Sequence, residues 1–399
     1  MLQISTRASQ LQASPLRKLA GAAEERKTKG VRVFHLNIGQ PDLKTPDSFF
    51  ETLKTLSENP IAYSQSQGKK ETIAAWQRYY ATLSVELSEK EIVITTGGSE
   101  ALQFAFNVVA DSGDEVIVFE PFYTNYNAFS TVAGTKLVPV TLDIANGFHL
   151  PSREVVEAAI TPRTRAILVC NPSNPTGTVM SEDELQMIAD MAKAHDLFII
   201  ADEVYREFVF EGLPKTFLTH TDIADRLIVV DSASKRFNLC GARVGTLVSR
   251  NMDVMQAVVK LAMSRLASPS VEQLALIPVI DGFAQTLPSV VAEYRARLDT
   301  AYELLGSIPG VTLHKPEGAF YMIIGLPVES AEDFCKWTIE EFADNNETVL
   351  VAPAAGFYAT PGKGRNEIRI ACVLQIESLT RAIHLIHLAL KAYPYGKSI

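Results

Sequence analysis

Residues 231–245 have the sequence DSASKRFNLCGARVG and follow a short apolar run, Leu227–Val230, that is typical of a buried strand. The strand ends in serines and a single lysine, Lys235, and a glycine-spaced segment that carries Arg243 comes next. Burial disfavours the charged ammonium form, so we expect a lysine at the end of a buried strand to have a lowered pKa. A neutral amine of this kind is nucleophilic and forms a Schiff base with an aldehyde.

The residues around Lys235 are suited to hold a phosphate. Ser232 and Ser234 supply hydroxyl donors, and the guanidinium of Arg243 supplies charged ones. A lysine, phosphate donors and a strand end occurring together predict pyridoxal 5′-phosphate as the cofactor. A surface lysine in an ordinary strand-to-helix loop would show the same short pattern, so the choice between the two depends on the rest of the chain.

Composition and charge exclude several classes of protein. The chain has 399 residues, 47% of them hydrophobic, which is enough for one large core or two domains. Its formal net charge is −9 and it has no run of basic residues, so we expect no nucleic-acid partner. The N-terminus lacks the apolar core of a signal peptide and no apolar run reaches membrane-spanning length, so we expect a cytoplasmic protein without a membrane partner. The four cysteines are far apart and form no C-x-x-C pair, which argues against a metal site or a disulfide framework.

From residue 91 onward, apolar runs alternate with helical patterns. The expected strands cover residues 92–94, 115–119, 136–140, 166–170, 197–200, 227–230 and 244–249. Continuous apolar strands separated by helices predict an α/β fold with a mostly parallel central sheet that helices cover on both faces. The segments before this region predict a strand at 31–38, a helix at 47–56 capped by Asp47, and a helix at 70–83. Ser181–Glu184 has the sequence of a capping box and predicts a helix that ends at Ala194.

The composition changes near residue 285. A helical stretch over 269–305, with a break expected around Gly282 and Pro288, leads into a region of mixed strands and helices. Its expected strands are residues 311–313, 319–324, 349–351 and 368–372. We therefore expect an N-terminal arm and helix at 1–30, a large cofactor-binding domain at 45–285, and a smaller α+β domain built from 31–44 and 286–399.

In open parallel sheets, ligands bind beyond the carboxyl ends of the strands, and here those ends carry most of the polar candidates. Gly98, Ser99 and Glu100 open a helix whose N-terminal N–H groups suit a phosphate, although a plain turn with Ser99 as N-cap has the same sequence. Tyr123 follows the next strand, where its ring can stack on a flat heterocycle. Tyr126 is its rival for a polar role, and core packing is the alternative for a lone aromatic.

Three further segments add polar groups. The prolines of NPSNPTG (171–177) hold Asn174 rigidly, where its amide can donate to a phenolic oxygen or cap its own turn. Asp202 ends the most apolar strand, where a carboxylate is costly unless it is paired, either with a protonated pyridine nitrogen or as a helix N-cap. Tyr205 lies one helical turn further on. Arg369, in EIRIA (367–371), has a fork that suits a substrate carboxylate or a pair with Glu367.

Taken in order, these segments resemble the fold-type I, class I/II aminotransferases of the aspartate aminotransferase superfamily. The matching segments are NIGQPD (37–42), TTGGSEAL (95–102), EPFYTNY (120–126), NPSNPTG (171–177), ADEVYREF (201–208), SASKRFNLCGARVG (232–245), PEGAFY (316–321) and EIRIA (367–371). Eight short matches in the family order are hard to obtain by chance. The resemblance implies a pyridoxal-phosphate enzyme that moves an amino group from an L-amino acid to a 2-oxo acid such as 2-oxoglutarate. It also implies a homodimer with active sites at the interface.

The resemblance implies a role for each matched residue. Lys235 would be the Schiff-base lysine and the proton shuttle. Asp202 would pair with the ring nitrogen of the cofactor, and Tyr123 would stack on the ring. Asn174 and Tyr205 would contact the ring hydroxyl. The phosphate would be held by Gly98, Ser99, Glu100, Ser232, Ser234 and Arg243, and Tyr63 would reach the phosphate of a partner subunit. The substrate carboxylate would bind Arg369, with Gly39 and Asn174 beside it.

The sequence leaves the amino donor open. Some family members that act on acidic substrates carry a lysine directly after the paired glycines, where this chain has Ser99. Arg236 and Arg265 are candidates for binding a side-chain carboxylate, whereas the aromatic residues Phe122, Tyr123, Phe320 and Phe357 would favour an aromatic or broad specificity. Two other hypotheses share the cofactor residues, because fold and cofactor do not fix a reaction. They are a pyridoxal-phosphate-dependent β-lyase and a non-catalytic sensor that binds the cofactor.

Overall fold

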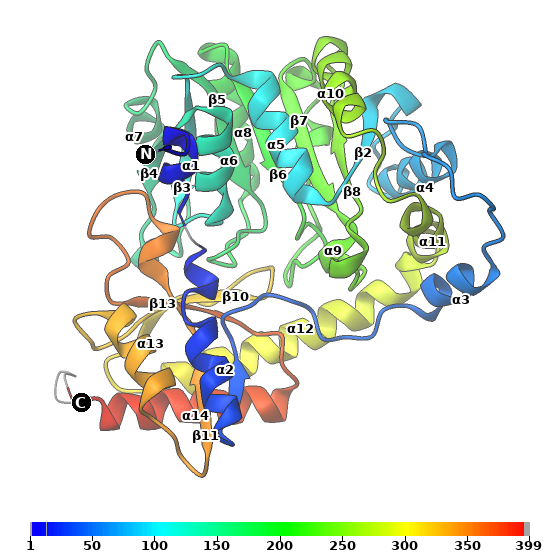
Figure 1. The fold of residues 1–399 in the computed structure, drawn as a ribbon. Coiled ribbons are helices and arrows are strands. Elements are labelled where there is room, and N and C mark those ends of the chain that lie inside the picture. Colours follow the sequence, from blue (N-terminus) through cyan, green and yellow to red (C-terminus); the bar gives the residue numbers. More distant parts are fainter. Residues whose placement is uncertain (1, 13, 395–399) are drawn as a thin grey trace.

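A computed structural model describes residues 2–12 and 14–394, and Figure 1 shows that they form two bodies joined by long connections. The upper body in that view is built around a seven-stranded sheet with helices on both faces. The lower body holds two smaller sheets and the long helices near the C-terminus.

The seven-stranded sheet has the order β2-β8-β7-β6-β5-β3-β4. Its strands are β2 (Ile92–Thr95), β3 (Glu115–Glu120), β4 (Lys136–Thr141), β5 (Thr164–Cys170), β6 (Phe198–Asp202), β7 (Leu227–Ser232) and β8 (Gly245–Val248). Five neighbours, from β7 to β4, run parallel, and β8 is antiparallel to both β7 and β2. The mostly parallel sheet expected from the sequence is therefore confirmed. Cys170 is paired with Asp202, and Asp202 with Val230, so these strands end at one level.

Helices cover both faces of this sheet because its strands are apolar on both sides. The helices of this body are α3 (Asp47–Thr55), α4 (Lys70–Ala81), α5 (Gly98–Val109), α6 (Asn125–Ala133), α7 (Arg153–Glu157), α8 (Glu182–Ala194), α9 (Ala233–Arg236), α10 (Met252–Ser264) and α11 (Ser270–Asp281). One apolar cluster joins α4, α8 and α11 to one face, and another joins α5, α6 and α10 to the other. In Figure 1, α5 and α6 lie in front of the strands.

Local signals set several of the helix ends. Ser181 and Glu184 form the capping box expected at the start of α8, where the Ser181 hydroxyl accepts a hydrogen bond from the Glu184 N–H. The expected cap of α3 is wrong by one position, because Asp47 is the first helical residue and Pro46 stands at the N-cap without a side-chain bond. Asp47 still lies in the first turn, where its charge is favourable to the helix dipole.

The second body combines both ends of the chain. A four-stranded sheet has the order β12-β13-β10-β9, and β1 pairs in parallel with β11. The bounds are β1 (Arg32–His35), β9 (Thr312–Leu313), β10 (Tyr321–Gly325), β11 (Glu347–Leu350), β12 (Ala352–Pro353) and β13 (Glu367–Ala371). Helices α12 (Phe283–Gly306), α13 (Ala331–Glu340) and α14 (Ile376–Ala392) pack on these strands in a shared apolar core. The division at residues 31–44 and 286–399 stays a proposal that this arrangement supports.

The helical stretch over 269–305 breaks once. Consecutive helices α11 and α12 meet at Gly282 with a bend of 81°, as expected. The break lies at Gly282, whereas Pro288 lies inside α12, in its second turn. Because proline has no N–H, the helical hydrogen bond from residue 288 to the carbonyl of residue 284 is missing there. Within residues 2–12 and 14–394, no single helix is long and apolar enough to cross a membrane.

The N-terminal segment touches both bodies. Helix α1 (Thr6–Gln10) lies beside α6, and the Arg7 guanidinium donates to the Val132 carbonyl at 3.1 Å. A short 3₁₀ turn, η1 (Pro15–Arg17), follows, and then α2 (Ala20–Thr28) packs Ala23 against apolar residues of β1, α13 and β11. Helix α1 therefore lies on the large-sheet body, and α2 lies on the second body.

Candidate active site

A cleft of about 520 Å³ opens where β5, β6 and β7 end, between the seven-stranded sheet and strands β10 and β13 of the second body. Twelve residues singled out from the sequence line it. They are Gly39, Gly98, Ser99, Tyr123, Asn174, Asp202, Tyr205, Ser232, Ser234, Lys235, Arg243 and Arg369. These residues come together because the parallel strands end at one edge and β13 lies across that edge.

Lys235 projects into the cleft from α9, which follows β7 directly. Its Nζ donates to the Gly39 carbonyl at 2.7 Å and lies 5.9 Å from the centre of the Tyr205 ring. Ser232 caps α9 by accepting a hydrogen bond from the Ser234 N–H at 3.1 Å. The lysine amine therefore stands at a defined point between the two bodies, partly buried and next to a backbone carbonyl.

One end of the cleft is a cradle of hydrogen-bond donors. Helix α5 begins there at Gly98, with free N–H groups in its first turn, and Gly97 before it has a φ of +75°. A Cβ at Gly97 would overlap the Arg243 guanidinium, so only glycine lets Arg243 lie against this helix end. Arg243 is fixed by the Cys240 carbonyl at 3.0 Å, and the Ser232 and Ser234 hydroxyls lie 2.9 Å apart beside it. Donors, a cation and a helix N-terminus in one place suit a phosphate.

Asp202 is a nearly isolated carboxylate at the floor of the cleft. It is 3% exposed and accepts hydrogen bonds from the Tyr126 hydroxyl at 2.7 Å and from the Val204 N–H at 3.4 Å. Burial raises the pKa of Asp202 to about 6, although these two hydrogen bonds act in the opposite direction. A cation opposite the carboxylate would stabilise its charged form. Tyr126, the rival of Tyr123 in the sequence, is the residue that holds Asp202.

The walls of the cleft offer a ring surface and polar groups. Tyr123 lies half-buried along one wall, with its hydroxyl held by the Asn125 amide at 2.8 Å, and burial raises the pKa of Tyr123 to about 12. The Tyr205 hydroxyl is 2.8 Å from that of Tyr321. Asn174 is buried, and within the described residues its side-chain oxygen has no hydrogen-bond partner. An unsatisfied amide oxygen at the cleft wall suits a ligand atom that donates a hydrogen bond, such as a hydroxyl.

Arg369 supplies a buried cation on β13 at the opposite end of the cleft. It is 1% exposed and lies 4.6 Å from the Tyr321 ring centre and 5.3 Å from that of Phe357. One Nη donates to the Asn37 carbonyl, while Nε has no hydrogen-bond partner among the described residues. Burial lowers the pKa of Arg369. A buried guanidinium with donors to spare is stabilised by a carboxylate, which accepts two parallel hydrogen bonds.

Two candidates from the sequence lie outside the cleft lining. The Glu100 carboxylate accepts from the Thr96 N–H at 2.8 Å and pairs with Arg265 at 3.1 Å, so only its main chain belongs to the first turn of α5. The Tyr63 side chain is 81% exposed and borders a separate hollow formed with Ile61 and residues 267–272.

The two arginines considered for a side-chain carboxylate are committed elsewhere. Arg265 pairs with Glu100 and donates to the carbonyls of Ser66 at 3.1 Å and Ile94 at 2.7 Å. Arg236 is fully buried and donates to Asp231 at 2.6 and 2.9 Å. Neither lines the cleft, so the idea that one of them contacts substrate does not fit the structure.

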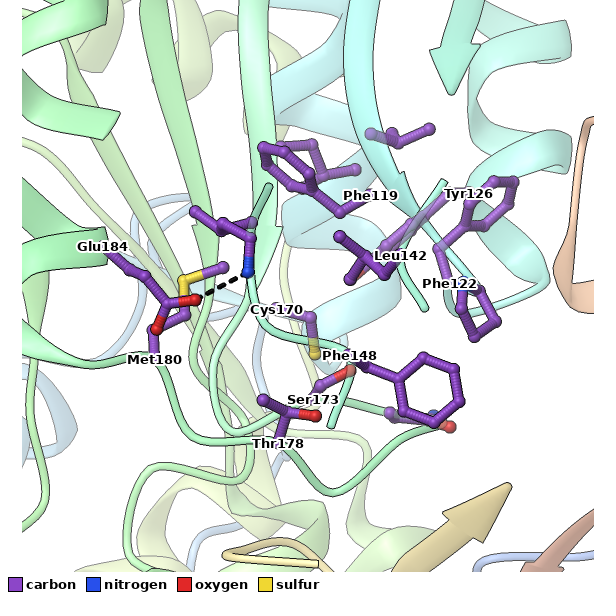
Figure 2. A pocket seen from close by; sticks show the side chains of 15 residues that line it. Phe119, Phe122, Tyr126, Leu142, Phe148, Cys170, Ser173, Thr178, Met180 and Glu184 are labelled. Carbon is purple, nitrogen blue, oxygen red and sulfur yellow. Dashed lines mark hydrogen bonds between the residues drawn. The ribbon is translucent and has the colours of Figure 1, made fainter. Parts of the chain in front are cut away.

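Most of the aromatic residues considered for substrate specificity also face away. Figure 2 shows Phe122 with Phe148 and Tyr126 around a separate apolar cavity of about 30 Å³ behind the end of β5. Phe320 is buried among the rings of Tyr205 and Tyr294, and Phe357 is buried behind Arg369. Tyr123 alone of the four lines the cleft.

Sequence reasoning missed several lining residues. Tyr321, in the PEGAFY segment, and Cys170, at the end of β5, could have been chosen from their positions in matched segments. Ser14 and Arg17 come from the N-terminal segment, which carries no matched motif. Within the described residues, no group of three or more His, Cys, Asp or Glu side chains is arranged to hold a metal ion.

The sequence of this chain is similar to a known protein family and to individual named proteins. The family described as aminotransferase class I and II matches residues 31–386. Aspartate aminotransferase of Bacillus subtilis is 30% identical over 96% of this chain and 98% of its own length. A probable N-acetyl-LL-diaminopimelate aminotransferase of the same organism is 32% identical over 92% of this chain and 91% of its own length.

Solved structures of similar proteins have the same fold. Aspartate aminotransferase of Thermotoga maritima superposes with a TM-score of 0.88 and 29% identity, covering 97% of this chain and 100% of its own. Alanine aminotransferase of Pyrococcus furiosus superposes with a TM-score of 0.88 and 27% identity, covering 98% of this chain and 100% of its own. These names share one type of reaction and differ in the amino acid.

Proposed function

Because the chain belongs to the class I and II aminotransferases, we propose that its cleft carries out transamination through Lys235, Asp202 and Arg369. Its activity is pyridoxal-phosphate-dependent transamination, and its substrates are an amino acid and a 2-oxo acid. The roles of single residues and the identity of the acceptor, for which we propose 2-oxoglutarate, go beyond the family assignment.

The cleft residues fit the cofactor group by group. The donors of Gly98, Ser99, Ser232, Ser234 and Arg243 suit the phosphate, and the Glu100 N–H lies in the same helical turn. Asp202 would hold a proton on the ring nitrogen, because a buried carboxylate with a raised pKa is stabilised by a cation. Asn174 and Tyr205 would contact the ring hydroxyl, and Tyr123 would lie against the ring. The unsatisfied Asn174 oxygen supports this fit.

Lys235 has two tasks in this proposal. When bound, the cofactor supplies an aldehyde that accepts the amino group and a ring that takes up the electrons released at the substrate Cα. The Lys235 amine would hold the aldehyde in the resting enzyme, and once the substrate has freed it, Nζ would remove the Cα proton. Arg369, with Gly39 and Asn174 beside it, would hold the substrate carboxylate so that the Cα–H bond faces Nζ.

One observation carries the assignment of these roles. A lysine amine and a buried guanidinium with an unpartnered Nε line the same cleft, and Asp202 lies on its floor. This set provides a nucleophile, a carboxylate receptor and an anion for a ring cation, which are the groups that the reaction requires.

Replacement of the lysine tests the proposal. Lys235→Ala should abolish transamination and prevent borohydride from fixing the cofactor to the protein, because no other lysine lines the cleft among the described residues. The matched control is Lys260→Ala, which removes an exposed lysine of α10. Turnover of the Lys235→Ala protein close to that of the control would contradict the assignment.

The β-lyase and sensor hypotheses are not favoured, since the relatives found are named as aminotransferases. Release of pyruvate and ammonia without a 2-oxo acid would indicate the lyase. Cofactor binding without turnover of any amino acid would indicate the sensor.

We further propose that two copies form a dimer with active sites at the interface. Tyr63 does not reach the cleft of its own chain and is 81% exposed, and the exposed apolar residue Ile61 lines the same hollow. An exposed tyrosine beside apolar groups is suited to an interface. The cytoplasmic location expected from the sequence also stays a prediction.

A further inference from the structure

Arg17 is a cleft residue that the roles above leave unused. It ends η1 and lines the cleft together with Ser14. Its side chain is exposed, and among residues 2–12 and 14–394 no hydrogen bond or ion pair holds its guanidinium. An unpaired cation on the rim of a cleft that also contains Lys235 and Arg369 has a free fork to offer an anion.

The charges of the cleft lining point to the kind of ligand. Four basic residues and one acidic residue line it: Arg17, Lys235, Arg243 and Arg369 against Asp202. Arg243 belongs to the phosphate cradle and Arg369 to the substrate carboxylate, while Lys235 serves the chemistry. The guanidinium of Arg17 has no role among these, and it suits a substrate with a second negatively charged group.

The fold places η1 on the body that carries Arg369. Pro15 of η1 packs on Gly356 in the 3₁₀ turn η7 (Ala354–Phe357) so closely that a Cβ at Gly356 would overlap the proline ring. Phe357, the next residue, faces Arg369 at 5.3 Å. Arg243 and the start of α5 belong to the large sheet, whereas η1, η7 and Arg369 are joined through β12 and β13. The backbone that carries Arg17 is therefore attached to the body that carries Arg369.

The backbone on both sides of Arg17 is held. Before it, α1 is bound to α6 through Arg7 and the Val132 carbonyl, and after it α2 is packed on the second body through Ala23. The exposed guanidinium thus starts from a fixed backbone position, which limits the conformational entropy lost when it binds an anion.

We infer that Arg17 binds the distal carboxylate of a dicarboxylic substrate, an acidic amino acid or its 2-oxo acid. The inference rests on the proposed function, because it assumes that Arg369 takes the first carboxylate. A guanidinium fork matches a carboxylate with two parallel hydrogen bonds. The residues considered earlier for this task are not available, since Arg236 is buried with Asp231 and Arg265 is paired with Glu100. Ser99 has no charge to contribute.

Arg17→Met keeps most of the side-chain length and removes the charge, and Arg17→Lys keeps the charge without the fork. The matched control is Lys18→Met, which removes one charge at the next residue, outside the cleft lining, where Lys18 pairs with Glu332 on the surface. All four proteins are loaded with cofactor. The dissociation constants of succinate and butyrate, a di- and a monocarboxylate, are measured from the change in cofactor absorbance.

The expected result is a loss of affinity for succinate and not for butyrate. Arg17→Met should weaken succinate binding by about 10- to 100-fold, the range for a lost hydrogen bond between charged groups, and leave butyrate within about twofold. Arg17→Lys should restore part of the loss, and Lys18→Met should bind both like the wild type. The same pattern is expected in kcat/KM for glutamate against alanine.

Other results overturn the inference. Equal weakening of succinate and butyrate by Arg17→Met, or the same loss in Lys18→Met, shows that Arg17 does not read a distal carboxylate. If the wild-type protein binds butyrate as tightly as succinate, Arg17 likewise does not bind a distal carboxylate. A wild-type protein without turnover of any amino acid contradicts the proposed function instead, and the binding measurements still decide the role of Arg17.

Discussion

Asp202→Asn should make the cofactor-free protein more stable at neutral pH, although it removes the carboxylate to which we assign a role in cofactor binding. The carboxyl is 3% exposed, and its pKa is raised from 3.8 to about 6, mainly by burial. In the cofactor-free protein the charged form accepts two hydrogen bonds, from Tyr126 and Val204, and it has no ion pair with any residue that the structure describes. Asparagine has nearly the same shape and no charge to bury.

The shift of about two pKa units corresponds to about 3 kcal/mol in the free energy of unfolding. Because the folded pKa is raised, the folded protein binds the proton more tightly than the unfolded chain does. Below the unfolded value of 3.8 both states are protonated and this carboxyl has no effect. Between 3.8 and about 6, stability falls as the pH rises, and above about 6 the full destabilisation remains.

Urea unfolding of cofactor-free wild type and Asp202→Asn, followed by circular dichroism, measures the difference. At pH 8 the variant should be more stable by about 1–3 kcal/mol, the lower values allowing for an incompletely bonded amide, and at pH 5 by about half of that. Added cofactor should stabilise the wild type more than the variant, since a ring cation favours the carboxylate. Asp225→Asn, at an exposed aspartate, is the control.

The reasoning would be refuted by cofactor-free wild type that is at least as stable as Asp202→Asn at pH 8, with the same pH dependence from pH 5 to pH 8. That outcome would mean that water or a charge satisfies Asp202 before the cofactor arrives.

Two further predictions concern the buried Asp231 and the number of chains in the assembled protein. Asp231→Asn should lower the free energy of unfolding by about 3 kcal/mol or more, because Asp231 is fully buried and accepts hydrogen bonds from both Arg206 and Arg236. The urea midpoint measures this, and a midpoint equal to that of Asp225→Asn would contradict it. The purified protein should have the molar mass of a dimer in light scattering, since the proposed role of Tyr63 requires a second chain. A monomer that retains full turnover would exclude that role.

The sequence was sufficient to predict the positions of the central strands. Strands β3, β5, β6 and β7 are continuous apolar runs because both faces are buried, and polar residues stop each run where the sheet ends. Parallel strands bring those ends together, so Asn174, Asp202 and Lys235 were expected at one edge. Strand direction is not encoded in an apolar run, which is why the antiparallel pairing of β8 with β2 and β7 could not be predicted from the same pattern.

Side-chain direction and long-range packing were the parts that the sequence did not reveal. Phe122 and Tyr123 are neighbours, yet the Phe122 ring lines the small apolar cavity of Figure 2 and the Tyr123 ring lines the cleft. Arg17 reaches the cleft only because Pro15 packs on Gly356, about 340 residues away in sequence. No local pattern around residues 14–19 encodes that contact.

Lys235 and Arg236 are also neighbours in the sequence whose side chains point in different directions, and the structure shows the consequence of this difference. One step along a helix turns the side-chain direction by about 100°, so Lys235 points into the cleft while its neighbour points into the protein interior. There Arg236 donates to Asp231 at 2.6 and 2.9 Å and also pairs with Glu207. Helix α9 has four residues, too few to be stable through its own hydrogen bonds. The buried guanidinium therefore anchors α9 to β7, so the arginine once considered for substrate binding fixes the position of the lysine beside it.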